Sequence, residues 1–306
     1  MVQRVIGLAL GSGGARGWAH IGALRALEEM GCVPEVVAGA SAGALVGAFH
    51  AAGKLDALES FARAITPGRF ARMLDFLGAG GGLVGARKVL ELFREHDLPE
   101  RIEELPRPFI AIATDLATGR EIWLREGSLA DAVRASVALP GVISPHRHEG
   151  RWLLDGGMSN PIPVSAVRAL GADRVIAVNP NGALLDGIWR PEEDKPHVLE
   201  REVAELARTR SLPEAVRSWL GEFLGRERRT PRPPSYLEVV DASIDILVER
   251  VRRSRLAGDP PSVLVDLVLP GIGVLDFHKA AETIAEGHRQ TKAMASRIRS
   301  ILDSAR

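Results

Sequence analysis

The sequence predicts an α/β protein whose central sheet is mainly parallel and carries helices on its faces. Two strand–loop–helix units follow one another at the start of the chain, and apolar strands keep alternating with helical stretches through residues 87–179. A strand that runs parallel to its predecessor needs a crossover connection, so this alternation favours a parallel sheet. The length of 306 residues suits one large α/β domain, and we expect residues 1–306 to form a single domain.

The first unit begins with an apolar strand at residues 5–10 and a glycine-rich loop at 11–17. The helix that follows ends at Gly31, and its apolar residues recur at helical spacing: Ile21, Leu24, Leu27 and Met30. The second unit consists of a strand at 35–38 and an apolar helix at 42–52, which is suited to burial against the sheet.

Further elements are predicted along the rest of the chain. The strands are expected at residues 109–114, 121–125, 152–154, 174–179 and 263–269. The helices are expected at residues 55–65, 87–94, 129–137, 164–170, 236–256 and 278–304. Residues 182–234 are charged and end in a basic, proline-rich stretch, which predicts a helical insertion within the domain. The basic end of this insertion is either a solvated face or a phospholipid contact.

The composition limits the partners and the compartment. Lys plus Arg and Asp plus Glu both number 39, so no overall field attracts nucleic acid, and contact with a membrane surface would have to be local. Cys32 is the one cysteine of the chain, which excludes an intramolecular disulfide and favours a reducing compartment. The sequence reaches its first predicted strand within a few residues and shows no signal-peptide pattern before it, so we expect a cytoplasmic protein. If it contacts a membrane, we expect it to bind there as a peripheral protein.

The segment Gly39-Ala40-Ser41-Ala42-Gly43 lies between the second strand and its helix, and it predicts a nucleophile elbow. A serine at such a turn adopts strained backbone geometry, and the glycines on either side let strand and helix pass without a Cβ clash. Its hydroxyl then stands clear of the backbone beside the first amides of the helix. The alternative interpretation is a tightly packed helix lined by small residues, and the neighbouring motifs decide between the two.

The glycine loop of the first unit predicts a place for negative charge. It lacks the third glycine of a dinucleotide-binding fingerprint, because Arg16 stands there, and it lacks the Lys-Ser/Thr pair of a Walker loop. Successive backbone N–H groups at a helix start can form a nest for an anion, and beside an activated serine such a nest is an oxyanion hole. Arg16 either pairs with a carboxylate or adds positive potential to this hole.

Asp155 is the candidate base for Ser41. It ends the apolar strand at 152–154 and is followed by Gly156 and Gly157, which leave room for another backbone to approach. An aspartate there could be only a turn residue, but next to an elbow and a glycine nest a Ser-Asp dyad is the better account. A carboxylate is a weak base, so partial burial would have to raise its proton affinity.

Three motifs, taken in their order along the chain, resemble the patatin-like phospholipase family: Gly13-Gly14-Ala15-Arg16-Gly17, Gly39-Ala40-Ser41-Ala42-Gly43 and Asp155-Gly156-Gly157. The further stretches that resemble bacterial members are Ala113 to Gly119, Ala135-Ser136-Val137-Ala138-Leu139-Pro140-Gly141 and Leu275-Asp276-Phe277-His278. The resemblance implies a three-layer α/β/α sandwich and hydrolysis of a fatty acyl ester or phospholipid without metal or organic cofactor. It implies Ser41 as nucleophile, Asp155 as base, and an oxyanion hole formed by Gly13, Gly14, Ala15, Arg16 and Gly17. Ser12 stands where the loop usually has glycine, which leaves a backbone donor but constrains its dihedral angle.

Two other functional interpretations remain open. Ser41, Asp155 and His278 come in the chain order of an α/β-hydrolase triad, although His278 is better explained by a structural hydrogen bond near the start of the last helix. The chain could also be a non-catalytic binding module with a vestigial site. No His, Cys or acidic spacing suggests a metal site.

The segment 70–85 combines bulky apolar residues with a glycine-rich loop. It is either a lid or acyl-contact surface, with Met73, Phe76 and Leu77 against the substrate, or an ordinary core helix with a loop.

Overall fold

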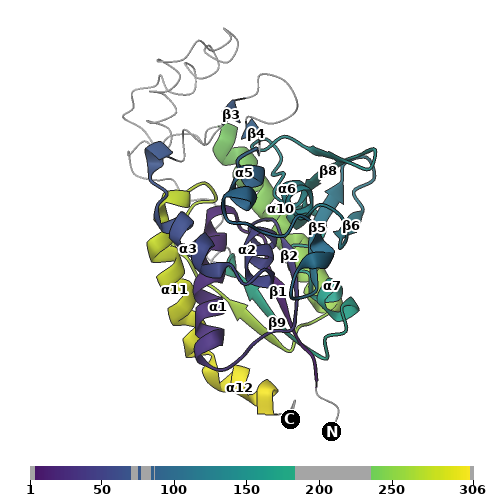
Figure 1. Cartoon of the computed structure of the whole chain (residues 1–306). Helices are drawn as coiled ribbons and strands as arrows, with labels where there is room; N and C mark the ends of the chain where they lie inside the picture. Colours follow the sequence, from purple (N-terminus) through teal and green to yellow (C-terminus); the bar gives the residue numbers. More distant parts are fainter. Residues whose placement is uncertain (1–3, 70–74, 77–83, 86, 183–235, 304–306) are drawn as a thin grey trace, which may run out of the picture.

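An eight-stranded sheet runs through the part of the chain that the structure describes (Figure 1). The structure is a computed structural model, and it describes residues 4–69, 75–76, 84–85, 87–182 and 236–303. The strands of the sheet are β1 (Ile6–Leu10), β2 (Val36–Ala40), β5 (Phe109–Asp115), β6 (Glu121–Leu124), β7 (His146–His148), β8 (Arg151–Asp155), β9 (Arg174–Asn179) and β10 (Val263–Asp266). β3 (Asp75–Phe76) and β4 (Val84–Gly85) form a separate pair.

The sheet is parallel in its larger part, as the alternation of elements predicts. The strand order is β10-β9-β1-β2-β5-β8-β7, and the neighbours from β10 to β5 pair in parallel. β6, β7 and β8 run antiparallel to their partners. Every residue of β2 and β5 is buried, because helices cover both faces of the sheet at its centre. The predicted strands are confirmed within a few residues, and β7 is an addition that the sequence did not reveal.

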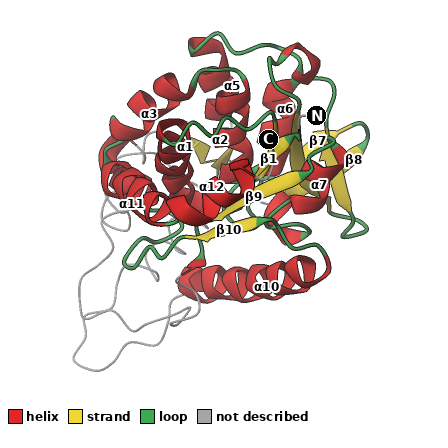
Figure 2. Ribbon diagram, turned by 90° about the horizontal axis from the view of Figure 1, so that it is seen from below, coloured by secondary structure: helices red, strands yellow, loops and turns green. Residues whose placement is uncertain are grey.

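Helices lie on both faces of the sheet, which confirms the predicted three layers (Figure 2). One face packs against α1 (Ala19–Glu29), α2 (Ala42–Ala51), α3 (Leu55–Arg63), α5 (Arg87–Glu95), α6 (Leu129–Ser136) and α11 (Ala280–Ala293). The other face packs against α7 (Val164–Ala169) and the end of α10 (Tyr236–Gly258). Short 3-10 turns complete the path: η1 (Gly14–Trp18), η2 (Ile102–Glu104), η3 (Gly156–Met158) and η5 (Phe277–Lys279).

The C-terminal helix differs from its prediction. Residues 278–304 were expected to form one helix, but α11 ends before Met294 and α12 (Ala295–Asp303) continues in another direction (Figure 1). The break has a packing reason, because it lets Ile298 be fully buried against the main hydrophobic core.

α1 and α11 pack at unusually close range because each contributes a glycine to the contact. A Cβ on Gly22 would lie 1.9 Å from the carbonyl oxygen of Ile284, and a Cβ on Gly287 would lie 2.2 Å from that of Ala19. Such distances are far below van der Waals contact, so both positions require glycine.

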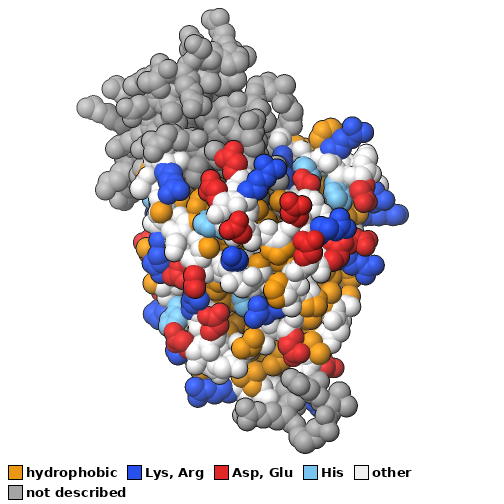
Figure 3. Space-filling model, in the orientation of Figure 1, with side chains coloured by type: hydrophobic (Ala, Val, Ile, Leu, Met, Phe, Trp, Pro, Cys, Tyr) orange, Lys and Arg blue, Asp and Glu red, His pale blue; other side chains and the backbone are white. Residues whose placement is uncertain are grey.

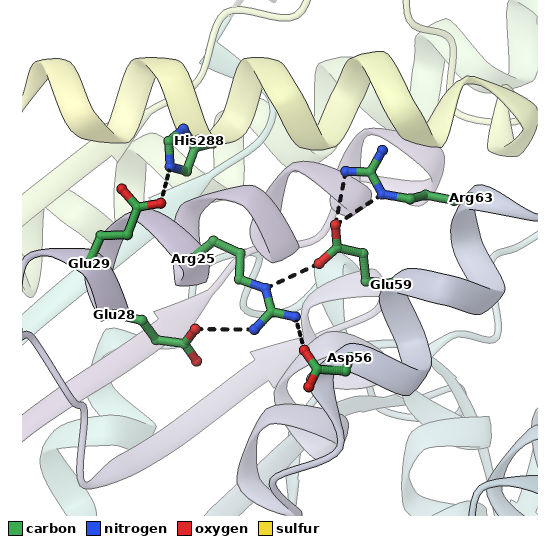
Figure 4. Close-up of polar contacts among 7 residues, drawn as sticks. All are labelled: Arg25, Glu28, Glu29, Asp56, Glu59, Arg63 and His288. Atoms are coloured by element: carbon green, nitrogen blue, oxygen red, sulfur yellow. Dashed lines mark hydrogen bonds and ion pairs between the residues drawn. The ribbon is translucent and has the colours of Figure 1, made fainter.

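A network of charged side chains ties α1 to α3 and α11 at the surface (Figure 4). The Arg25 guanidinium of α1 donates to three carboxylates, those of Glu28, Asp56 and Glu59. On the other side of α1, the Glu29 carboxylate pairs with the imidazole of His288 on α11, Oε1 to Nε2 2.9 Å. The network therefore adds polar contacts to the α1–α11 packing and also joins α1 to α3.

The surface carries charges of both signs. On the face drawn in Figure 3, Lys and Arg side chains are interspersed with Asp and Glu, in keeping with the equal numbers of the two kinds. Among the helices of the described residues, none has both the length and the apolar character needed to cross a membrane.

Candidate active site

Ser41 occupies the turn between β2 and α2, as the sequence predicts. Its backbone has φ 55° and ψ −123°, which is a strained conformation for a residue with a side chain. A Cβ on Gly39 would lie 2.3 Å from the carbonyl oxygen of Gly43, and a Cβ on Gly43 would lie 2.2 Å from that of Leu10. Both glycines are therefore required for α2 to pack directly against the strand that precedes it and against β1.

β8 brings Asp155 to this turn because it pairs with the same edge of β5 as β2 does. β6 pairs with residues 111–114 of β5, of which 111 and 112 also pair with β2 and 113 and 114 also pair with β8. A strand residue can pair with only one neighbour on each edge, so β6 lies along one edge of β5, and β2 and β8 share the other edge. Along the shared edge, Ala40 of β2 stands opposite Ile112, and Asp155 of β8 stands opposite the next residue, Ala113. Ser41, which directly follows the end of β2, therefore lies beside Asp155.

The Ser41 hydroxyl donates a hydrogen bond to the Asp155 carboxylate, Oγ to Oδ2 2.5 Å. The second carboxylate oxygen, Oδ1, accepts the backbone N–H of Gly157 at 2.7 Å. Both side chains are buried, with 8% of Ser41 and 3% of Asp155 exposed. Burial raises the pKa of Asp155 to about 6, against the opposing effect of its hydrogen bonds from Ser41 and Gly157. The carboxylate is thus a stronger base than an aspartate in water.

The backbone of Asp155 and Ser41 is held by side chains for which the local sequence pattern predicts no role. The Thr114 hydroxyl of β5 donates to the carbonyl oxygen of Asp155 at 2.8 Å and contacts the hydroxyl of Ser159 at the same distance. The Ser136 hydroxyl accepts the backbone N–H of Ser41 at 2.9 Å. Thr114 and Ser136 lie in stretches that resemble bacterial patatin-like proteins, and that resemblance was the only signal that could have found them.

The glycine loop lies against both partners of the Ser-Asp contact. A Cβ on Gly17 would lie 2.3 Å from the Cβ of Ala42, and a Cβ on Gly157 would lie 2.7 Å from the Ser12 hydroxyl. The loop, the elbow and the end of β8 therefore lie side by side.

The amides of the loop differ in what they donate to. Ala15 N–H donates to the carbonyl oxygen of Val274 at 2.7 Å, and Arg16 N–H donates to that of Gly13 at 3.1 Å. Within the described part of the chain, the N–H groups of Gly13 and Gly14 have no hydrogen-bond acceptor.

Ser12 does not keep the free backbone donor that the sequence suggested. Its N–H donates to the carbonyl oxygen of Pro161 at 2.9 Å, because the loop packs against the segment that follows η3. Its own carbonyl oxygen accepts the side-chain amide of Asn181 at 2.8 Å. Ser12 is therefore part of the scaffold of the loop.

Arg16 pairs with a carboxylate, which was one of the two explanations left open. Its Nη2 lies 3.0 and 2.9 Å from the two carboxylate oxygens of Asp245 on α10. The guanidinium is 8% exposed and the carboxylate 13% exposed, so water screens the pair little. This pair fixes the first turn after the glycine loop to a helix 229 positions further along the chain.

The structure gives no support to a histidine triad. His278 lies in η5, directly before α11, where the sequence places it, and it is half-buried. Ser41 donates directly to Asp155, and among the described residues no histidine contacts either side chain. Among the described residues, the partly exposed His278 ring makes no hydrogen bond, so the structural hydrogen bond expected of it stays a prediction.

The predicted acyl contacts fall on a part of the chain that the structure hardly describes. Met73 and Leu77 lie outside the described residues. Phe76 lies in β3, but only its backbone is described. Of the predicted insertion at 182–234, residues 183–234 also lie outside the described residues. The acyl contacts and the insertion stay predictions.

The comparison with known protein families identifies the chain. The model of a family described as patatin-like phospholipase matches residues 8–168, which is more than half of the chain and contains both Ser41 and Asp155. The chain belongs to the patatin-like phospholipase family. An uncharacterized NTE family protein of Mycobacterium tuberculosis is 38% identical to it, over 92% of this chain and 89% of that protein.

Two further similarities are more partial. Lysophospholipase nte1 of Aspergillus fumigatus is 34% identical over 58% of this chain and 12% of that protein. The crystal structure of VipD from Legionella pneumophila covers 96% of this chain and 67% of the VipD chain, with 14% identity and a TM-score of 0.44. Membership of the patatin-like phospholipase family supports lipid acyl hydrolysis as the general class of activity.

Proposed function

We propose that this patatin-like protein is a serine lipid acyl hydrolase that cleaves fatty acyl esters, of the phospholipase A, lysophospholipase or esterase type, through a Ser-Asp dyad. The observation that carries the proposal is the 2.5 Å hydrogen bond from the Ser41 hydroxyl to the buried Asp155 carboxylate at a strained strand-to-helix turn. A nucleophile and a base within hydrogen-bond reach are the minimum that covalent acyl transfer requires.

The first half of the reaction forms an acyl-enzyme. Ser41 Oγ attacks the acyl carbonyl carbon while its proton passes to Asp155 Oδ2, and the carbonyl oxygen becomes an oxyanion. When the tetrahedral intermediate collapses, the bond to the alcohol oxygen breaks, and Asp155 returns the proton to that oxygen. The alcohol portion of the lipid leaves and the fatty acyl group stays on Ser41.

The second half of the reaction releases the fatty acid. Asp155, again a carboxylate, takes a proton from a water molecule that attacks the acyl carbonyl carbon. Collapse of the second tetrahedral intermediate returns a proton from Asp155 to Ser41 Oγ. Burial suits Asp155 to both roles, because a pKa of about 6 leaves it ionised at neutral pH but basic enough to accept a proton.

The oxyanion would be held by backbone N–H groups of the glycine loop. Of the five residues in the predicted hole, Gly13 and Gly14 are the best candidates, because the N–H groups of Ala15 and Arg16 already have acceptors. Ala42 can add a third donor, since the first N–H groups of a helix have no acceptor within that helix. Preorganised donors of this kind typically contribute about 3–4 kcal/mol each to transition-state stabilisation.

Reaction with a fluorophosphonate probe and hydrolysis of a chromogenic acyl ester test this function. We expect the native protein to hydrolyse the ester and to carry the probe on Ser41, as mapped by mass spectrometry. Ser41→Ala should lose both, and Asp155→Ala should lose hydrolysis. Ser144→Ala is a matched control, because Ser144 is also a buried serine (9% exposed) but bonds to Arg134 and not to the dyad.

Two results would refute the dyad. Hydrolysis retained by Ser41→Ala or Asp155→Ala would exclude these residues from the roles proposed for them. A folded native protein that takes no probe and hydrolyses no ester in a lipid extract would favour the alternative of a non-catalytic binding module.

A further inference from the structure

The segment of residues 136–138 contacts the backbone of both Ser41 and Asp155. It begins at Ser136, the last residue of α6, and belongs to the stretch 135–141, to which no role has yet been assigned. We propose that residues 136–138 form a dyad clamp, which sets the position of the nucleophile relative to the base, and that Ser136 is a positioning residue for catalysis. This inference rests on the proposed function.

The first contact of the dyad clamp holds the strained turn. Ser41 is the N-cap of α2, so its N–H has no acceptor within the helix, and the hydroxyl of Ser136 accepts it at 2.9 Å. The φ of 55° at Ser41 belongs to a class of strained backbone conformations that persist only when the surroundings enforce them. Ser136 is fully buried, so no water molecule can take its place as acceptor without a rearrangement.

The second contact of the dyad clamp holds the base. The backbone N–H of Asp155 donates to the carbonyl oxygen of Ala138 at 2.9 Å. Asp155 is the last residue of β8, and its pairing with Ala113 is the last one between β8 and β5. The bond to Ala138 therefore restrains the backbone of Asp155 at the point where the pairing of strands ends. Ala138 is fully buried, like Ser136.

The dyad clamp can set the distance between Ser41 and Asp155 because it is short and because the helix that carries it is packed in the core. One residue, Val137, separates its two contacts in sequence, and α6, which carries it, is anchored by the fully buried side chains of Leu129, Val133 and Ala135. Movement of the turn relative to Asp155 would therefore have to break one of the two bonds or displace α6 from the core. The 2.5 Å contact between Ser41 and Asp155 is set by this common support.

Ser136→Ala tests the dyad clamp on the full-length protein. The substitution removes the acceptor for the Ser41 N–H and leaves the nucleophile and the base in the chain. We expect kcat for a chromogenic acyl ester to fall by about ten- to a hundredfold, the range typical of a misplaced catalytic group, while KM stays within about twofold. Ser144→Ala serves as the matched control, because it removes another buried serine hydroxyl near the end of α6, and its kcat should stay native.

A second pair of variants separates positioning from folding. Threonine and valine at position 136 have nearly the same shape, and only threonine keeps the acceptor oxygen. Ser136→Thr should therefore retain a kcat at least tenfold above that of Ser136→Val, even if both lower the melting temperature equally and if Ser136→Ala does not fold.

The outcomes distinguish this inference from the proposed function. If the native protein hydrolyses the ester, Ser41→Ala does not, and Ser136→Ala keeps native kcat, the dyad clamp is wrong and the dyad stands. Equal kcat values for the threonine and valine variants would overturn the dyad clamp as well. If the native protein hydrolyses no ester at all, the proposed function itself fails.

Discussion

Asp155→Asn should make the protein more stable at neutral pH while it abolishes hydrolysis. Asparagine has nearly the shape of aspartate and its side-chain oxygen can still accept the N–H of Gly157, but it carries no charge and cannot act as a base. The native carboxylate is 3% exposed, so at neutral pH the fold bears the cost of a desolvated charge that the variant lacks.

The pKa of Asp155 gives the size of this effect. Burial raises it from 3.8 to about 6, and a difference of one pKa unit corresponds to about 1.4 kcal/mol, so the ionised carboxylate destabilises the native fold by about 3 kcal/mol. The substitution also loses the hydrogen bond from Ser41, at about 1 kcal/mol. The net gain at pH 8 is therefore about 2 kcal/mol, or roughly 3 °C in melting temperature for a chain of 306 residues.

The pH dependence identifies the cause. Because the pKa is higher in the folded state than in the unfolded state, the native protein loses stability as the pH rises from about 4 to about 6, and the cost is complete above that window. The melting temperatures of Asp155→Asn and native protein should therefore differ most above pH 6, and the difference should shrink as the pH falls to 4.

Ser41→Ala is the matched control for this prediction, because it abolishes activity but keeps the carboxylate. Its loss of the Ser41 hydrogen bond should raise the pKa of Asp155 further, so it should retain the pH-dependent loss of stability and shift it to higher pH. A difference between Asp155→Asn and native protein that does not change from pH 4 to pH 8 would refute the reasoning.

Three further outcomes follow from the structure. Ester hydrolysis should need ionised Asp155, so kcat/KM should fall about tenfold per pH unit below pH 6 and level off above it. Arg25→Met should remove the bonds to three carboxylates and lower stability by about 1 kcal/mol in urea unfolding, while kcat stays native, because the pairs are partly exposed and include neither Ser41 nor Asp155. Gly22→Ala should lower stability by more than about 2 kcal/mol, because its Cβ would lie 1.9 Å from the carbonyl oxygen of Ile284, whereas Gly258→Ala, with open space around it, should not.

A specific result would contradict each of these three predictions. A pH–rate profile that is flat down to pH 4 would exclude Asp155 as the titrating base. A loss of activity in Arg25→Met without loss of stability would mean that the network in Figure 4 acts on the site. Equal stability of Gly22→Ala and Gly258→Ala would mean that α1 and α11 do not need the close contact described above.

Local patterns in the sequence predicted most of the elements. The glycines around Ser41 and the apolar run before it are sufficient to predict a strand, a strained turn and a helix, because backbone sterics act over a few residues. The helix predicted at 278–304 was the exception, because it is divided into α11 and α12. The break at Met294 depends on the burial of Ile298, a contact with the core that helical periodicity does not encode.

The partners of the glycine loop lay beyond what the sequence could reveal. Arg16 was known to need an explanation, but Asp245 is 229 positions away, and nothing in the local pattern connects the two. The same holds for the amides of the loop, because the acceptor of the Ala15 N–H is the carbonyl oxygen of Val274, in a segment between β10 and η5.

Local sequence patterns are enough to predict the kinds of groups at this site: a serine on a strand-to-helix turn, an aspartate at the end of a strand, and a loop rich in backbone donors. That these groups meet depends on how the strands pair across the sheet. Ser41 and Asp155 are in contact because β8 continues along the edge of β5 at the point where β2 stops, with Asp155 opposite Ala113. Strand register of this kind depends on contacts across the whole sheet, and a shift of one residue would turn Asp155 to the opposite face.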